Sequence, residues 1–177
     1  VLDADGVTPV ANAQVRVTQE KAGGGAAESS RTTDDDGRFR VTDVMAGPLV
    51  ARATPGDGIL TVETGVTVPA SPPNADIELR LPPSAVLVGT VRNASGTPVA
   101  DASVFVASPA GDLGAAAYGL TDATGGFRGE RVPIGSFALQ VCEPTYQNCP
   151  NITGEVATAG EHPVNVTLPG TGSVDVG

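Results

Sequence analysis

The chain contains few of the residue types on which catalytic and metal sites are usually built. Its 177 residues include no tryptophan, a single histidine and two cysteines, and aromatic residues make up 3% of the total. The histidine, His162, is accompanied by no serine or cysteine arrangement of the kind that nucleophilic catalysis needs, so we expect a solvated turn residue. The sequence therefore predicts a protein that is not an enzyme and has no tightly bound cofactor.

Long apolar runs and an excess of positive charge are also missing. The sequence has 20 acidic and 10 basic residues, a formal net charge of −10 at pH 7. Nucleic acids and anionic membrane surfaces attract Lys and Arg, so neither is an expected partner. No apolar run reaches the roughly 20 residues that cross a bilayer, and no secretory signal pattern opens the sequence. We therefore expect no insertion into a membrane.

The two cysteines lie close together in the segment CEPTYQNC, as Cys142 and Cys149. A zinc site would need further Cys or His ligands nearby. A local disulfide is therefore the preferred interpretation, and a pair of reduced, inert thiols is the alternative. Because disulfides persist in oxidising compartments, the pair predicts an extracellular or cell-surface location.

The sequence is rich in turn-forming residues and in small aliphatic residues, and their pattern occurs twice along the chain. TPVANAQVRV at 8–17 matches TPVADASVFV at 97–106, and IELRLP at 77–82 matches VNVTLP at 164–169. Between them, TDDDGRFR matches TDATGGFR. The offset runs from 87 residues (77 to 164) to 89 residues (8 to 97). Each repeat has the size of a small β-sandwich domain.

Alternation of apolar and polar residues, with turn residues about every 8–12 positions, favours a β-sandwich in each repeat. We expect an all-β protein of two tandem seven-stranded Greek-key sandwiches, covering residues 1–83 and 84–170. In the first repeat we expect a flexible glycine-rich loop at 20–30. Phe39 and Phe127 should be equivalent core residues. The strands expected in the second repeat are 86–92 with Val86 and Val88 buried, 102–108, 115–121, one entered at Phe127, 136–142, 152–157 and 163–168.

The last residues, GSVDVG, alternate as a strand does at its beginning. If this end is written before the start of the sequence, SVDVG followed by VLDADG aligns with the opening of the second repeat without a gap. Val174 then falls on Val86, and Leu2 falls on Val91. Residues 171–177 are therefore predicted to start the first strand of a further repeat.

This alignment predicts that units are joined head-to-tail with neighbouring copies of the same repeat. The front of the first strand of 1–83 is expected from the preceding unit. The units would be one continuous polypeptide, or separate subunits joined by strand complementation. The inter-unit strand would consist of Ser173, Val174, Asp175, Val176, Gly177, Val1 and Leu2.

The pattern G-x-V-x-(N/D)-x-x-G-x-P-V-x-x-A-x-V-x-V, followed by T-D-x-x-G-x-F and x-V-x-x-G-x-(Y/F)-x-L, resembles the carboxypeptidase regulatory-like domain. The resemblance covers nearly the whole chain twice and implies a transthyretin-like sandwich. It is a poor guide to function, because such modules mostly support or link other domains. The second repeat carries the pattern through Gly89, Val91, Gly96, Pro98, Val99, Ala102, Val104, Thr121, Asp122, Gly125, Phe127, Val132, Gly135, Phe137 and Leu139.

Collagen-adhesin B-type modules, which the chain also resembles, join an early Lys covalently to a late Asn or Asp. Lys21 lies in or beside the glycine-rich segment, and the corresponding part of the second repeat has no Lys. We therefore expect no such isopeptide bond.

Two acidic turns, DADG and DDDG, offer carboxylates that suit Ca²⁺. The corresponding segments of the other repeat, NASG and DATG, lack most of these acids. Turn formation, in which Asp caps the turn and Gly supplies a positive φ, is the preferred interpretation. The alternative is a weakly bound calcium ion at Asp3, Asp5, Asp34 and Asp36.

Three functions remain open from the sequence. The preferred one is a structural module of a long repetitive extracellular fibre or surface stalk. The second is a carbohydrate- or protein-binding adhesin module, for which Tyr118 and Tyr146 are the only tyrosines that could stack on a sugar, although loop packing is preferred for both. The third is an accessory domain of a secreted hydrolase.

Overall fold

In the computed structural model, the described residues are 1–21, 23–56, 59–71, 74–108, 116–146 and 148–170. The chain divides into two compact units, Val1–Pro83 and Ser84–Gly177, which we call unit 1 and unit 2. Every regular element among these described residues is a strand, so the expectation of an all-β sandwich fold is confirmed. No helix long and apolar enough to cross a membrane was found in the described part of the chain.

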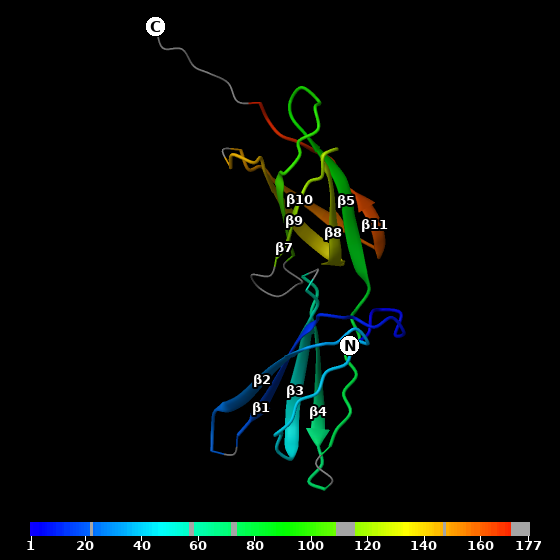
Figure 1. Ribbon diagram of the computed structural model, residues 1–177, viewed down its shortest axis with the longest axis vertical. Coiled ribbons are helices and arrows are strands. Elements are labelled where there is room, and N and C mark those ends of the chain that lie inside the picture. The colour runs from blue at the N-terminus through cyan, green and yellow to red at the C-terminus, as the bar shows by residue number, and fades with distance from the viewer. Residues whose placement is uncertain (22, 57–58, 72–73, 109–115, 147, 171–177) are drawn as a thin grey trace. The chain divides into compact units, whose positions relative to one another are not determined.

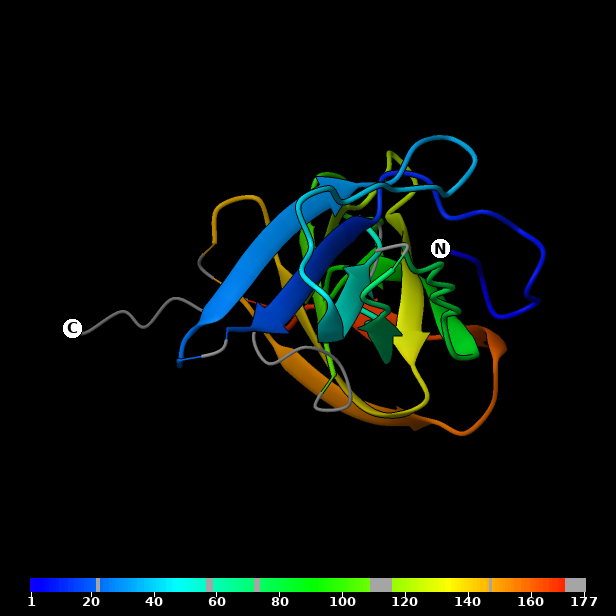
Figure 2. The ribbon, with the colours of Figure 1, turned by 90° about the horizontal axis from the view of Figure 1, so that it is seen from below.

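Unit 1 is built on one antiparallel sheet with the strand order β2-β1-β3-β4. β1 and β2 lie side by side in both views (Figures 1 and 2). One face of β1 is buried, because Val15, Val17 and Gln19 alternate with exposed positions. The strands are β1 (Gln14–Glu20), β2 (Ala26–Thr32), β3 (Gly47–Thr54) and β4 (Val62–Val68).

The loop expected at 20–30 is shorter than predicted. Residues 26–30 belong to β2, and the connection from β1 is a tight hairpin in which Lys21 N donates to Gly25 O at 2.9 Å. The three consecutive glycines at 23–25 all have positive φ, from 85° to 115°. A glycine-rich stretch therefore forms the turn itself, and the small residues after it pair with β1.

The core of unit 1 is aliphatic, as the lack of aromatic residues required. It lies between the sheet and the segments that precede β1 and follow β4. Its members are Val1, Val10, Ala13, Val15, Val17, Leu49, Ala51, Ala53, Leu60, Val68, Leu79 and Leu81.

Unit 2 has two sheets. One has the order β10-β9-β6-β7, and in the other β5 pairs with β8 on one edge and with β11 and β12 on the opposite edge. Figure 1 shows β5 between β8 and β11. The strands are β5 (Ser84–Arg92), β6 (Ser103–Ala107), β7 (Ala116–Leu120), β8 (Gly126–Pro133), β9 (Gly135–Cys142), β10 (Asn151–Val156), β11 (Gly160–Pro163) and β12 (Val166–Thr167).

The face that β5 buries differs from the prediction. Ala85, Leu87 and Val91 are fully buried at 0% exposure, whereas Val86 and Val88 are half-buried. The positions from 85 to 88 are all apolar, so alternation alone does not choose a face. The sheet pairing makes that choice, because β5 lies between two neighbours and keeps the phase set by Val91.

A buried threonine forms the same hydrogen bonds in both units. Thr33 Oγ1 accepts from Ala13 N at 2.8 Å and donates to Val10 O at 2.7 Å. Thr121 Oγ1 does the same with Ala102 N at 2.9 Å and Val99 O at 2.7 Å. The repeated T-D pair in the sequence signalled an important turn, but the hydroxyl network itself becomes visible only in three dimensions.

Candidate functional site

Unit 2 shows how a complete first strand is held in this fold. β5 pairs antiparallel with β8, starting at Thr90 opposite Gly126, and pairs parallel with β11, starting at Ala85 opposite Gly160. The front of β5 therefore makes ladder hydrogen bonds along both edges. Such a strand is a central one, and its removal would leave two edges without partners.

Hydrogen bonds identify the residue of unit 1 that corresponds to the back of β5. Val1 N donates to Gly37 O at 2.5 Å, just as Val91 N donates to Gly125 O at 2.8 Å. The glycine is required at this point in both units. A Cβ on Gly37 would lie 2.5 Å from Val1 O, and a Cβ on Gly125 would lie 2.5 Å from Val91 O. Val1 therefore occupies the place of Val91.

This correspondence corrects the gapless alignment, which placed Leu2 on Val91. In both units the turn after the strand is closed by a bond from its first amide to its last carbonyl. The turn spans residues 3–8 in unit 1 and 93–97 in unit 2, so unit 1 has one additional residue. Val7, which is 78% exposed, is that residue. A solvent-exposed insertion of this kind shifts the register without changing the core pattern.

In front of Val1, unit 1 has an open groove of about 900 Å³ where unit 2 has residues 84–90. We call it the strand groove. One wall is the segment 36–44, the counterpart of β8, and the other is 74–78, the counterpart of β11. The floor comes from the sheet and consists of Val17, Leu49 and Val68.

Equivalent apolar side chains beside the first strand are buried in unit 2 but only half-buried in unit 1. Phe127 is 9% exposed and Val132 is fully buried beside β5. Their counterparts Phe39 and Val44 are half-buried and line the strand groove. The prediction that Phe39 and Phe127 are equivalent is therefore wrong for this chain, because in unit 1 none of the described residues takes the place of the front of β5.

Neither wall of the strand groove forms a regular strand, whereas β8 and β11 both do. At its far end, the wall formed by 36–44 is anchored by a buried glutamine. Gln19 Nε2 donates to Met45 O at 2.8 Å, and Gln19 Oε1 accepts from Met45 N at 2.9 Å. The groove thus combines an apolar floor with two stretches of backbone whose counterparts bind a strand, which is the arrangement that strand addition uses.

The rim of the strand groove carries charges of both signs. Asp36, Asp76 and Glu78 are acidic, and Arg38 and Arg40 are basic. Such a mixed rim does not favour a ligand of one charge. It suits a segment recognised mainly through its backbone and through alternate apolar side chains.

Burial lowers the pKa of the Val1 amino group at the end of the strand groove, and the neighbouring carboxylates Glu78 and Asp34 partly oppose this. The charged amine lies where unit 2 has an uncharged backbone amide, that of Val91.

The acidic turns satisfy their own backbone. Asp5 accepts bonds from the side chain of Thr8 at 2.5 Å and from the amides of Val7 and Thr8, both at 2.8 Å, and these bonds lower the pKa of Asp5 to about 2. Asp34 accepts from the amides of Asp36 and Arg38 at 3.1 and 2.8 Å.

Of the other two calcium candidates, Asp3 accepts from Ala4 N at 2.7 Å, and the carboxylate of Asp36 lies 3.6 Å from the guanidinium of Arg38. Within the described ranges, no group of three or more His, Cys, Asp or Glu side chains converges as a metal site would require.

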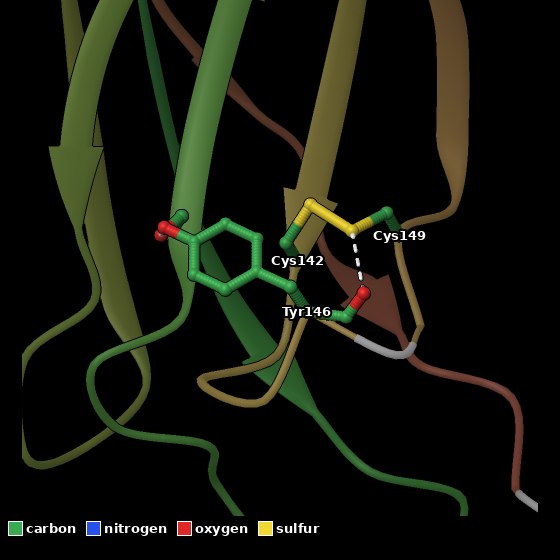
Figure 3. The surroundings of a disulfide bond; sticks show 4 residues. Cys142, Tyr146 and Cys149 are labelled. Atoms are coloured by element: carbon green, nitrogen blue, oxygen red, sulfur yellow. Dashed lines mark hydrogen bonds between the residues drawn. A yellow bond between two sulfur atoms is a disulfide. The ribbon is translucent and has the colours of Figure 1, made fainter.

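Cys142 and Cys149 form the predicted disulfide, with an S–S distance of 2.13 Å, at the end of β9 (Figure 3). Tyr146, inside the loop, has φ +56° and its hydroxyl is 2.8 Å from Ser103 Oγ, a buried residue of β6. The backbone oxygen of Tyr146 lies 3.9 Å from Cys149 Sγ, which has no hydrogen to donate and so makes only a contact. Tyr146 therefore fastens the loop to β6.

Of the predicted inter-unit strand, the structure places Val1 and Leu2. Leu2 N donates to Leu79 O at 2.8 Å and Leu2 O accepts from Leu81 N at 2.9 Å. Ser173, Val174, Asp175, Val176 and Gly177 lie outside the described residues, as does the side chain of Tyr118.

His162 was expected in a solvated turn, but the structure places it in strand β11, where it is half-buried. Its ring nitrogen Nε2 is 2.8 Å from Thr158 O.

Comparison with known proteins concerns both units. The profile of the carboxypeptidase regulatory-like domain matches residues 1–81 and again residues 86–169. A search of curated protein sequences gave no match. Among solved structures, GBS52, the minor pilin of Streptococcus agalactiae, is similar with a TM-score of 0.50 and 15% identity over 96% of this chain and 87% of that chain.

Two further pilins show weaker similarity. The shaft pilin SpaA of Lactobacillus rhamnosus GG has a TM-score of 0.39 at 12% identity, covering 97% of this chain and 89% of that one. BcpA, the major pilin subunit of Bacillus cereus, has a TM-score of 0.38 at 10% identity, covering 90% and 60%. At such identities the similarity describes the fold alone.

Proposed function

We propose that this chain, which belongs to the carboxypeptidase regulatory-like domain family and has one copy of the domain in each unit, is a non-enzymatic structural module of a repetitive extracellular or cell-surface fibre. Neighbouring copies are joined head-to-tail through the strand groove of unit 1. The disulfide supports an oxidising location. The similarity in fold to a minor pilin agrees with a role in a fibre.

The strand groove is the observation that carries this proposal. Its two walls are the counterparts of the segments that pair with the front of β5 in unit 2, β8 and β11. Half-buried apolar side chains along it, Phe39, Val41 and Val44, would be removed from water by a bound strand. Burying apolar area contributes about 25 cal/mol per Å², and the two walls supply backbone partners.

The occupant is residues 172–177 of a neighbouring copy. This segment is as long as the part of β5 from Ala85 to Thr90, and its valines at 174 and 176 alternate with Ser173 and Asp175, as in a strand with one apolar face. When it fills the groove of the next copy, residue 177 of one copy lies beside residue 1 of the next. A contact between different surfaces of identical units generates a filament when the rotation between successive units does not close a ring, and an open filament is the assembly that we propose.

The proposal is tested with two copies joined directly, Gly177 to Val1, and hydrogen exchange measured by mass spectrometry. The second copy then carries a filled groove and the first an open one. Peptides from the walls, 38–45 and 74–79, should show two populations of equal size, of which one is protected. The first copy is the internal control. A single population exchanging as fast as in the isolated chain would overturn the proposal.

A denaturing gel of the native material separates the two modes of joining. One continuous polypeptide gives a very large band or a ladder, whereas stacked subunits give a band near 17.6 kDa. Both results are compatible with head-to-tail joining.

A further inference from the structure

The register of the occupying strand follows from the structure, and it differs from the one that sequence alignment gives. Three inward positions of β5 are fully buried, Ala85, Leu87 and Val91. Val1 takes the place of Val91 by its hydrogen bond to Gly37. Counting back along the strand from Val1 therefore assigns each residue of 172–177 to a position of β5.

We propose, on the basis of the head-to-tail joining proposed above, that Val174 fills the deeply buried position of Leu87 and is the residue that specifies the joint. Gly172 then takes the place of Ala85, and Gly177 that of Thr90. The gapless sequence alignment instead places Asp175 on Leu87. The two registers differ by one residue, and in a strand this exchanges the buried face for the other one.

The walls of the strand groove favour valine at this position. In unit 2, Leu87 lies opposite Gly129 of β8 and opposite His162 of β11. The corresponding residues of unit 1 are Val41 and Ala75, both partly buried against the aliphatic core. On the wall 36–44, unit 1 thus has a valine where unit 2 has a glycine, and this bulkier wall matches a residue smaller than leucine. On the wall 74–78, Ala75 replaces His162, whose ring contacts Thr158 O at 2.8 Å in its own segment.

A carboxylate at the same position would be unfavourable. It would lie against Val41 and Ala75, both apolar. An ionised carboxylate removed from water without a partner is among the most destabilising groups that a core can contain. The register that buries Asp175 is therefore disfavoured.

Two contacts oppose this register. Val176 falls on Gly89, where a Cβ would lie 1.8 Å from Val164 O and 2.9 Å from Phe127 Cε1. The counterpart of Phe127 is Phe39, which is half-buried and lines the open groove. The counterpart of Val164 is Ile77, in a segment that forms no regular strand in unit 1. Moving a segment that makes no ladder hydrogen bonds costs less free energy than burying an unpaired carboxylate. In the occupied groove, the wall at Ile77 therefore lies further from the occupying strand than Val164 lies from β5.

The test uses the full 177-residue chain with the sequence of residues 172–177 added directly before Val1, at micromolar concentration. Amides of the walls should exchange at least about tenfold more slowly than in the unextended chain, as expected for new ladder bonds. Val174→Asp within the extension should abolish this protection, and Asp175→Val should retain it.

A matched control inserts one Thr between the extension and Val1, which moves Gly177 onto Gly89 and Asp175 onto Leu87. The direct extension should protect the walls better than the extension with the inserted Thr. Two results would overturn the register but leave the joint intact. One is stronger protection of the walls with the inserted Thr than with the direct extension. The other is a large gain in protection from Asp175→Val together with little loss from Val174→Asp. Equal exchange with every extension, including a scrambled one, would overturn the proposed function itself.

Discussion

Replacing the buried threonine of each unit by valine tests the correspondence between the repeats. Thr33→Val and Thr121→Val keep the shape of the side chain and remove the hydroxyl. In each unit that hydroxyl joins one buried amide and one carbonyl, at distances of 2.7 to 2.9 Å. Thr33 is 3% exposed and Thr121 is 2% exposed, so water does not replace the lost bonds.

The magnitude follows from the two groups that lose their partner. A buried polar group left without a partner costs about 1–3 kcal/mol. Because an amide and a carbonyl are affected in each unit, we expect a loss of about 2–4 kcal/mol, a large part of the stability of a small domain. Thr→Ser keeps both hydrogen bonds and removes one methyl group, which should cost only about 1 kcal/mol.

Hydrogen exchange followed by mass spectrometry in increasing denaturant gives the free energy of unfolding for each unit separately. Thr33→Val should destabilise unit 1 and leave unit 2 unchanged, and Thr121→Val should do the reverse. Tyrosine fluorescence gives an independent measure of unit 2, because both tyrosines, Tyr118 and Tyr146, belong to it. A loss smaller than that of Thr→Ser in either unit would refute the hydrogen-bond argument.

Three further measurements check other parts of the structure. Phe127→Ala should cost about 3–5 kcal/mol in unit 2, and Phe39→Ala distinctly less in unit 1 because Phe39 is half-buried beside the groove; equal losses in thermal unfolding would contradict the open groove. The Val1 amino group has a pKa below its ordinary value of about 8, so the unfolded chain binds more protons between the two values. The stability of unit 1 should therefore rise as the pH increases through that window, and N-terminal acetylation should remove this dependence. Reducing the Cys142–Cys149 disulfide should lower the stability of unit 2 by about 2–3 kcal/mol, and the mass of the unreduced protein should be two hydrogens lower; free thiols in fresh material would count against an extracellular location.

Much of the fold could be predicted because its signals are local. Period-two alternation and the spacing of turns located most strands of unit 2 to within a few residues. The disulfide was predictable because a short separation and the lack of other ligands left few alternatives. These features depend on neighbours along the chain, which the sequence displays directly.

The candidate site was only partly predictable. Repetition led to the prediction that another unit supplies the front of the first strand of unit 1, but it did not identify which residues would line that place. Val41 and Val44 became site residues because folding brings the segment 36–44 across from 74–78. The exposed insertion at Val7 also shifted the alignment of Val1 and Leu2 with the second repeat by one residue. A gapless alignment does not distinguish an inserted surface residue from a core residue.

By itself, the amino-acid sequence determined the class of fold, the two repeats and the aliphatic nature of the core, because these follow from composition and from period-two patterning. Only the tertiary structure decided which face of β5 is buried, that Val1 rather than Leu2 stands in the place of Val91, and that unit 1 contains a groove. The physical reason is that burial and hydrogen-bond partners are properties of segments far apart in the chain. In a strand with two apolar faces, the sequence does not determine which face is buried, and pairing with the neighbouring strands decides it.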